Sequence, residues 1–224
     1  VHQRLGLEKG KYILLSAHRE ENIDTEKNFL SLFTAINKMA EKYDMPILYS
    51  CHPRSRNRLA ASGFQLDPRV IQHEPLGFHD YNCLQMNAFA VVSDSGTLPE
   101  ESSFFTSIGH PFPAICIRTS TERPEAIDSG SVELIITTGA TGYLGQDCAP
   151  KAVEEVAEQL IPGIPEALRA YNLRYSKKAM LDCMAAGIRK NTLIVNLPES
   201  AKTAKEDMEY ILSEVVQVVE SINL

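Results

Sequence analysis

The stretch VVSDSGTLPEESSFF, residues 91–105, passes from an apolar run through a turn of small residues into a helical pattern. The apolar run has the length of a buried strand, and two adjacent carboxylates, Glu100 and Glu101, fall in the first turn of the expected helix. The turn offers backbone N–H groups and hydroxyls at a helix N-terminus, where anions bind favourably. It has no lysine, so it does not match a nucleoside-triphosphate P-loop. We therefore expect a turn that suits a pair of phosphates carrying a sugar.

The same alternation of apolar runs and helical patterns continues through the 224 residues. We expect strands at 11–18, 46–52, 69–75, 88–96, 113–120, 132–142 and 191–198. We expect helices at 25–43, 54–62, 79–88, 98–105, 150–160, an interrupted one at 164–184, and 203–222, with a short helix or loop at 121–130. Such alternation predicts the α/β class, with a doubly wound, mostly parallel, Rossmann-like sheet and helices on both faces in three αβα layers.

The amino-acid composition indicates which kinds of partner and cross-link the protein is expected to lack. The chain is 44% hydrophobic and 23% charged, which is enough to bury a core, and its net charge of −7 does not suggest nucleic-acid binding. No apolar run approaches the roughly 20 residues that cross a bilayer. The five cysteines are an odd number without paired spacing, so they indicate neither a metal site nor a disulfide framework. We expect a soluble cytoplasmic protein with free thiols and no membrane partner.

Ligands of parallel sheets bind at the carboxyl ends of the strands, and two further polar stretches fall there. SAHREEN (16–22) ends a strand with His18, and RTSTERPEAIDSG (118–130) places Arg123 in a polar turn; both side chains suit phosphate oxygens. Arg54, after another strand, is a further possible phosphate contact. Each has a structural alternative: His18 as a strand-end histidine, Arg123 as the partner of a neighbouring glutamate, and Glu100 as the partner of the helix dipole.

HREEN, SDSGTLPEE and TERPEAIDSG, in this order and spacing, resemble the carboxyl-terminal domain of the non-hydrolysing UDP-N-acetylglucosamine 2-epimerase family. Thr97 stands where the common branch has a second glycine, so the resemblance is nearer to the branch of UDP-N-acetyl-L-fucosamine synthesis. It covers about residues 3–133. It implies half of a two-domain fold, an isomerase-like activity without a cofactor, and UDP or a UDP-sugar as the partner.

The resemblance also implies roles for individual residues. His18 would be the catalytic group at the diphosphate, and Glu101 would bind the ribose. The other implied substrate-binding residues are Arg19, Leu76, Tyr81, Ser95, Gly96, Thr97 and Arg123. The family's amino-terminal domain, which carries most of its acid–base carboxylates, has no counterpart here. We therefore expect weak nucleotide binding without turnover, unless a missing domain or a second copy of the chain completes the site.

The second half resembles another family. LIITTGATGYLGQD, GIPEALRAY, AMLDCMAAGIR and TLIVNLPESAK look like the carboxyl-terminal half of the MogA/MoaB-like molybdopterin-binding family of adenylyltransferases, over about residues 133–222. This resemblance implies a candidate site at Gly139, Thr141, Gly142 and Asp147, with Asp147 placed for Mg²⁺-assisted adenylyl transfer and NLPES on the pterin side. The chain departs from the family pattern at Ala140, Gln146, Asp182, Cys183 and Glu199.

We therefore expect two halves, residues 1–133 and 134–224, that complete one continuous α/β domain with about eight strands. Two half-proteins joined near Glu133 suggest an engineered or recombined chimera, and a divergent natural protein is the alternative. Three functions remain open at this point: a UDP-sugar-binding, epimerase-type domain; a molybdopterin or adenylate binder of molybdenum-cofactor synthesis; and a scaffold without a specific ligand.

Overall fold

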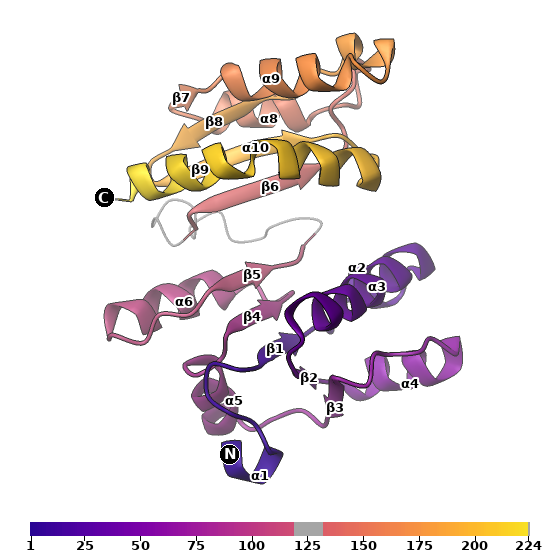
Figure 1. Ribbon diagram of the computed structural model, residues 1–224, viewed down its shortest axis with the longest axis vertical. Helices are drawn as coiled ribbons and strands as arrows, with labels where there is room; N and C mark the ends of the chain where they lie inside the picture. The colour runs from indigo at the N-terminus through magenta and orange to yellow at the C-terminus, as the bar shows by residue number, and fades with distance from the viewer. Residues whose placement is uncertain (119–131, 224) are drawn as a thin grey trace. The chain divides into compact units, whose positions relative to one another are not determined.

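A computed structural model describes residues 1–118 and 132–223. The chain divides into two compact units, Val1–Arg123 and Pro124–Leu224, called here the first and second units. Each has its own sheet with helices on both faces, as the sequence predicted for the fold class (Figure 1). Arg123 and the expected helix or loop at 121–130 lie outside the described residues.

The first unit contains a five-stranded, fully parallel sheet in the order β3-β2-β1-β4-β5. Its strands are β1 (Ile13–Ser16), β2 (Ile47–Ser50), β3 (Val70–His73), β4 (Ala90–Ser93) and β5 (Ala114–Cys116). The chain order reverses beside β1, whose Ser16 pairs with Ser93 at the end of β4. Two carboxyl ends therefore meet at the place where doubly wound sheets bind ligands.

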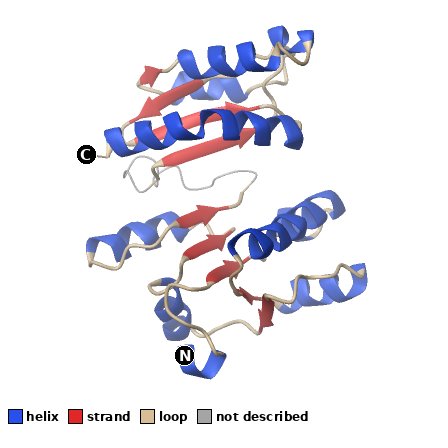
Figure 2. Cartoon of the chain, in the orientation of Figure 1, coloured by secondary structure: helices blue, strands red, loops and turns tan. Residues whose placement is uncertain are grey.

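Alternating strand residues bury the two faces of this sheet under different helices (Figure 2). Ile13 and Tyr49 pack on one face with Phe33, whereas Leu14 packs on the other face with Leu98. The first face is covered by α2 (Glu20–Ile23), α3 (Glu26–Tyr43) and α4 (Pro53–Ser62), and the second by α1 (His2–Leu5), α5 (Phe78–Gln85) and α6 (Leu98–Ser107).

The second unit has a mixed sheet in the order β6-β9-β8-β7. Its strands are β6 (Leu134–Thr138), β7 (Gln159–Leu160), β8 (Ala186–Arg189) and β9 (Thr192–Leu197). Only β6 and β9 are parallel, because β8 turns back on β9 and β7 runs against β8. The helices are α8 (Ala149–Val156) on one face, α9 (Gly163–Asn172) and α10 (Ala201–Ile222) on the other, and the 3₁₀ helix η1 (Lys177–Leu181).

The strand pairing corrects the expected single sheet. Strand β6 pairs with β9, and β5 pairs with β4, so the pairs in the described part of the chain form two separate sheets. The sequence pattern also did not predict strands β7 and β8. The expected helix at 150–160 ends at Val156, and residues 159–160 are extended instead. Strand β8, AGIR, is short and poor in β-branched residues, so its propensity for a strand is weak.

Candidate functional site

The buried carboxylate of Asp94 organises the ends of β1 and β4. Its Oδ2 accepts hydrogen bonds from the backbone N–H groups of His18 (2.9 Å) and Arg19 (2.8 Å) and from Nδ2 of Asn22 (3.1 Å). Its Oδ1 lies 3.3 Å from Nδ1 of His18. The Asp94 side chain is fully buried, whereas that of His18 is half exposed. This carboxylate therefore fixes the segment that carries His18 against the turn at 94–97.

The turn that follows Asp94 forms a chain of hydroxyl hydrogen bonds. The N–H of Thr97 donates to Oγ of Ser95 at 3.3 Å, and the two hydroxyl oxygens are 3.0 Å apart. The Thr97 hydroxyl donates to Oε1 of Glu101 at 2.5 Å, and Oε2 of Glu101 accepts from Nε2 of the buried Gln85 at 2.8 Å. Because Thr97 gives its proton to Glu101, the Ser95 hydroxyl is the donor between the two hydroxyls.

Tyr81 of α5 lies beside this turn, and Leu76 packs in the same hydrophobic cluster as Tyr81. Burial raises the pKa of Tyr81 to about 12, the nearby charge of Glu101 adds to the rise, and hydrogen bonds with Ser16 and Ser93 oppose it. The N–H of Leu76 donates to Oγ of Ser50 at 3.4 Å. The phenol is thus held at the ends of β1 and β4, where the structure brings it together with Glu101.

Two arginines suggested by the sequence have different surroundings. Arg19 presents its backbone N–H to Asp94 and begins α2. Arg54 forms exposed ion pairs with Glu20, at 2.9 Å, and with Asp24. These pairs connect α4 to α2 and favour the surface-charge interpretation of Arg54 over a phosphate contact.

The turn after β6 in the second unit is built on its own residues. Gly139 and Ala140 both have positive φ, at 86° and 52°. The carboxylate of Asp147 accepts from the N–H of Leu144 at 2.9 Å, and a Cβ on Gly142 would lie 2.5 Å from Oδ2 of Asp147. A side chain at position 142 would therefore have to displace the Asp147 carboxylate, and Ala140 occupies a backbone conformation that favours glycine.

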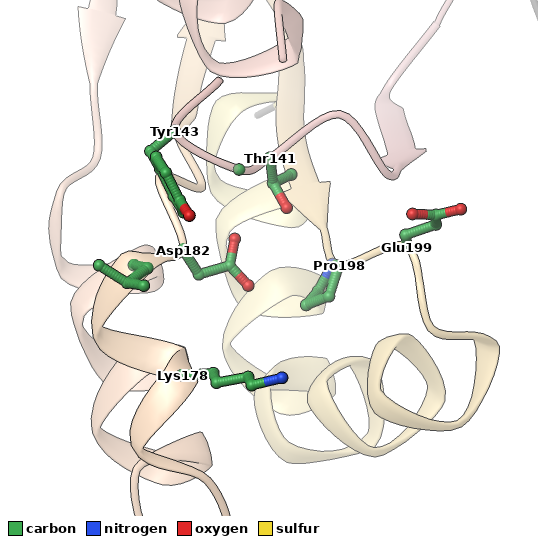
Figure 3. Close-up of a pocket in the computed structure, with 8 residues that line it drawn as sticks. Thr141, Tyr143, Lys178, Asp182, Pro198 and Glu199 are labelled. Carbon is green, nitrogen blue, oxygen red and sulfur yellow. The ribbon is translucent and has the colours of Figure 1, made fainter. Parts of the chain in front are cut away.

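A cavity of about 360 Å³ lies beside this turn (Figure 3). Its lining residues are Thr141, Gly142, Tyr143, Lys178, Leu181, Asp182, Pro198 and Glu199. The carboxylate of Asp182 points towards the Thr141 hydroxyl, and Lys178 extends into the same hollow, whereas Glu199 points away from it. Gly139 and Asp147, the other two candidates from the sequence, are not among the lining residues of this cavity.

Two carboxylates of this unit have a raised pKa: Asp182, which lines the cavity, and Asp207, which is buried. Burial raises the pKa of Asp182, and its hydrogen bond with Thr141 and the charge of Arg169 oppose the rise. Burial also raises the pKa of Asp207, against the hydrogen bond from Asn172, whose Nδ2 lies 2.8 and 3.0 Å from the two oxygens of Asp207. Both carboxylates are therefore easier to protonate than in an unfolded chain.

The sequence did not predict the residues whose partners lie far away in the chain. Asp94 lies in the motif SDSG, and no separate role was expected for it, although an acidic residue directly after a buried strand needs partners to be stable. Lys178 and Tyr143 gave no signal, because they come from segments that meet only in the folded unit. The described residues contain no cluster of three or more His, Cys, Asp or Glu side chains placed to hold a metal ion. Within the same residues, the helices are too short or too polar to cross a membrane.

The fold defines an α/β protein with polar turns at the carboxyl ends of its parallel strands. Comparison with known proteins identifies its family. A family model described as UDP-N-acetylglucosamine 2-epimerase matches residues 1–143, so the chain belongs to this family. A second model, described as a probable molybdopterin binding domain, matches residues 120–217. The two matches share residues 120–143, which include β6 and the turn after it.

Individual relatives divide in the same way. A UDP-N-acetylglucosamine 2-epimerase of Methanococcus maripaludis is 34% identical over 126 residues, which are 54% of this chain and 33% of the relative. A molybdopterin adenylyltransferase of Helicobacter pylori is 36% identical over 95 residues, which are 42% of this chain and 54% of the relative. The solved UDP-GlcNAc 2-epimerase of Methanocaldococcus jannaschii is 30% identical with a TM-score of 0.49, covering 57% of this chain and 35% of that one.

The chain thus spans about a third of the epimerase and about half of the adenylyltransferase.

Proposed function

We propose that the first unit binds UDP, alone or as part of a UDP-sugar, at the carboxyl ends of β1 and β4. Membership in the epimerase family supports this, and the observation that carries it is the cross-link of the two strand ends by Asp94. The cross-link places His18 beside the turn that opens α6, where backbone N–H groups and the helix dipole favour a diphosphate.

The hydroxyl chain suggests how the ligand enters. In the present arrangement the protons of Ser95 and Thr97 are directed to Thr97 and Glu101. The N–H groups of Ser95 and Thr97 also have partners, the hydroxyls of Ser93 and Ser95. A phosphate oxygen would therefore have to replace one of these acceptors, or a hydroxyl would have to rotate to donate to it. A ribose hydroxyl that donates to Glu101 would replace Thr97 as the donor and release the Thr97 proton for the phosphate. Nucleoside and diphosphate are thus bound cooperatively in this proposal.

Turnover by these 224 residues alone is not part of the proposal. They match a third of the length of the archaeal epimerase. We propose that the chain by itself binds its ligand without epimerising it. The sugar that it accepts would be one from the UDP-N-acetyl-L-fucosamine branch, which Thr97 implies.

Isothermal titration with UDP tests this function, with ADP as the control ligand. We expect UDP to bind, and Ser95→Ala and Glu101→Gln each to weaken it at least tenfold, since each breaks the hydroxyl chain. Ser107→Ala, at the opposite end of α6, is the matched control and should bind as the parent does. Equal affinity for UDP and ADP, or unchanged binding in both site variants, would reject a uridine site here.

A second candidate function belongs to the second unit. Its cavity of about 360 Å³ has the size of a small-ligand site and combines Lys178 with the Thr141 hydroxyl. We propose an adenylate or pterin as its ligand, in line with the match to the molybdopterin-binding model.

Thermal unfolding with ATP and Mg²⁺ tests the second candidate. A ligand at 100 times its dissociation constant adds about 2.7 kcal/mol of stability, a shift of a few degrees for a domain of this size. A shift that Lys178→Ala abolishes would support this site. The absence of a shift with ATP as well as with UDP would favour the third function, a folded scaffold without either ligand.

A further inference from the structure

The two oxygens of the Asp94 carboxylate have different surroundings. Oδ2 accepts three N–H groups, two from the backbone of His18 and Arg19 and one from Asn22. Oδ1 is buried and makes no hydrogen bond within the described residues, and Nδ1 of His18 lies 3.3 Å from it. A buried carboxylate oxygen is strongly stabilised by a donor, and a neutral imidazole can supply one from Nδ1 if the proton is there.

We infer that Asp94 is a positioning residue that holds His18 in the tautomer with its proton on Nδ1. The lone pair of the neutral ring is then on Nε2. Because half of the His18 side chain is exposed while Asp94 is not, Nε2 is the nitrogen that remains available to a ligand. The partner of one ring nitrogen thereby decides the chemistry of the other.

This has a consequence for the ligand, which rests on the proposed function of the first unit. Nε2 as a lone-pair nitrogen accepts a hydrogen bond directly from a hydroxyl of a nucleotide sugar. It can donate to a phosphate oxygen only after the ring has gained a second proton. Because of Asp94, Nε2 of His18 accepts a hydrogen bond or a proton from the ligand, and it does not donate to phosphate while the ring is neutral.

Two other histidines of the same unit provide internal references. Nδ1 of His52 accepts the N–H of Arg54 at 3.3 Å, which requires the proton on Nε2. Nδ1 of His73 lies 2.7 Å from the carbonyl oxygen of Glu74, which requires the proton on Nδ1. His18 should therefore match His73 and differ from His52 in one spectrum of one protein.

Long-range ¹H–¹⁵N NMR of the full 224-residue chain, at about pH 8 where histidines are ordinarily neutral, measures this directly. We expect a protonated Nδ1 and an unprotonated Nε2 in His18. In Asp94→Asn the amide oxygen can keep the three N–H donors, while the amide NH₂ donates to Nδ1 and moves the ring proton to Nε2. Asn22→Ala is the matched control, because it removes one donor to Oδ2 and leaves the Oδ1 contact with His18.

The parent spectrum decides the tautomer even if a variant does not fold. A proton on Nε2 of His18 in the parent, or an unchanged tautomer in folded Asp94→Asn, would overturn the inference. Addition of UDP should then shift Nε2 of His18 more than Nδ1. If calorimetry shows UDP binding but neither nitrogen shifts, the ligand-facing role of Nε2 is wrong and the proposed function stands. If calorimetry shows no UDP binding, the proposed function fails, and the tautomer measurement still stands on its own.

Discussion

Both units hold a carboxylate in the region after a parallel strand, but they hold it in different ways. Asp94 binds a segment 75 to 76 residues away in the sequence, and thereby joins the ends of β1 and β4. Asp147 binds the N–H of Leu144, only three residues away. The carboxylate of the first turn therefore connects distant parts of its unit, whereas the carboxylate of the second turn holds only its own loop.

Replacing the two carboxylates separates these cases and should give the largest effect. Asp94→Ala leaves three N–H donors without their acceptor inside the first unit, so we expect a loss of about 3 kcal/mol or more in its unfolding free energy. Asp147→Ala removes the acceptor of an exposed hydrogen bond and should cost about 1 kcal/mol. Urea unfolding, with hydrogen exchange to assign each transition to a unit, measures both. Equal losses would contradict the distinction.

The pH dependence of stability should differ between the parent and Asp207→Asn. Burial raises the folded-state pKa of Asp207 above that of the unfolded chain. The protonated form is therefore favoured in the folded second unit, and its contribution is fully present below about pH 4 and is lost as the pH rises through the raised pKa. Each unit of pKa difference corresponds to about 1.4 kcal/mol.

Denaturant unfolding of the parent and of Asp207→Asn from about pH 4 to pH 8 measures this contribution. The stability of the variant should fall less over this range than that of the parent. Identical slopes would show that Asp207 does not carry the effect and would leave Asp182, whose pKa burial also raises, to be tested by Asp182→Asn.

The smallest effect should come from the backbone of the second turn. Ala140 has a φ of 52°, a conformation that costs a non-glycine residue about 1 to 2 kcal/mol. Ala140→Gly should therefore stabilise the second unit by about 1 kcal/mol, measured by thermal unfolding. Ala152→Gly, inside α8, is the matched control and should destabilise by about 1 kcal/mol. Destabilisation by both would show that chain entropy outweighs the strain at Ala140.

Much of the first unit could be predicted because its elements have strong periodic patterns. Strands β1, β2 and β4 are uninterrupted apolar runs that are buried on both faces, and α3 repeats its apolar residues at helical spacing. The second unit was less accessible. Strand β7 has two residues, and β8 has four and ends at a turn in which Lys190 has a φ of 51°. Elements this short are stabilised by their partners more than by their own sequence.

The candidate site divides along the same line. Ser95, Thr97 and Glu101 are close in the sequence, so one motif could suggest them together, and the structure joins them in one hydrogen-bonded chain. Gln85, which completes that chain, and Asp94, which fixes His18, act across 16 and 76 residues respectively. Contacts over such separations follow from strand order, which the sequence pattern alone leaves open.

The sequence by itself determined the α/β class, the strand ends that carry polar residues and the two families that the chain resembles, because periodicity and contiguous motifs are local properties. The tertiary structure decided that β6 pairs with β9 and that Asp94 faces His18. It also decided that Lys178 and Asp182 share a cavity with Thr141. These outcomes depend on which surfaces bury one another, and burial couples residues that no sequence spacing relates.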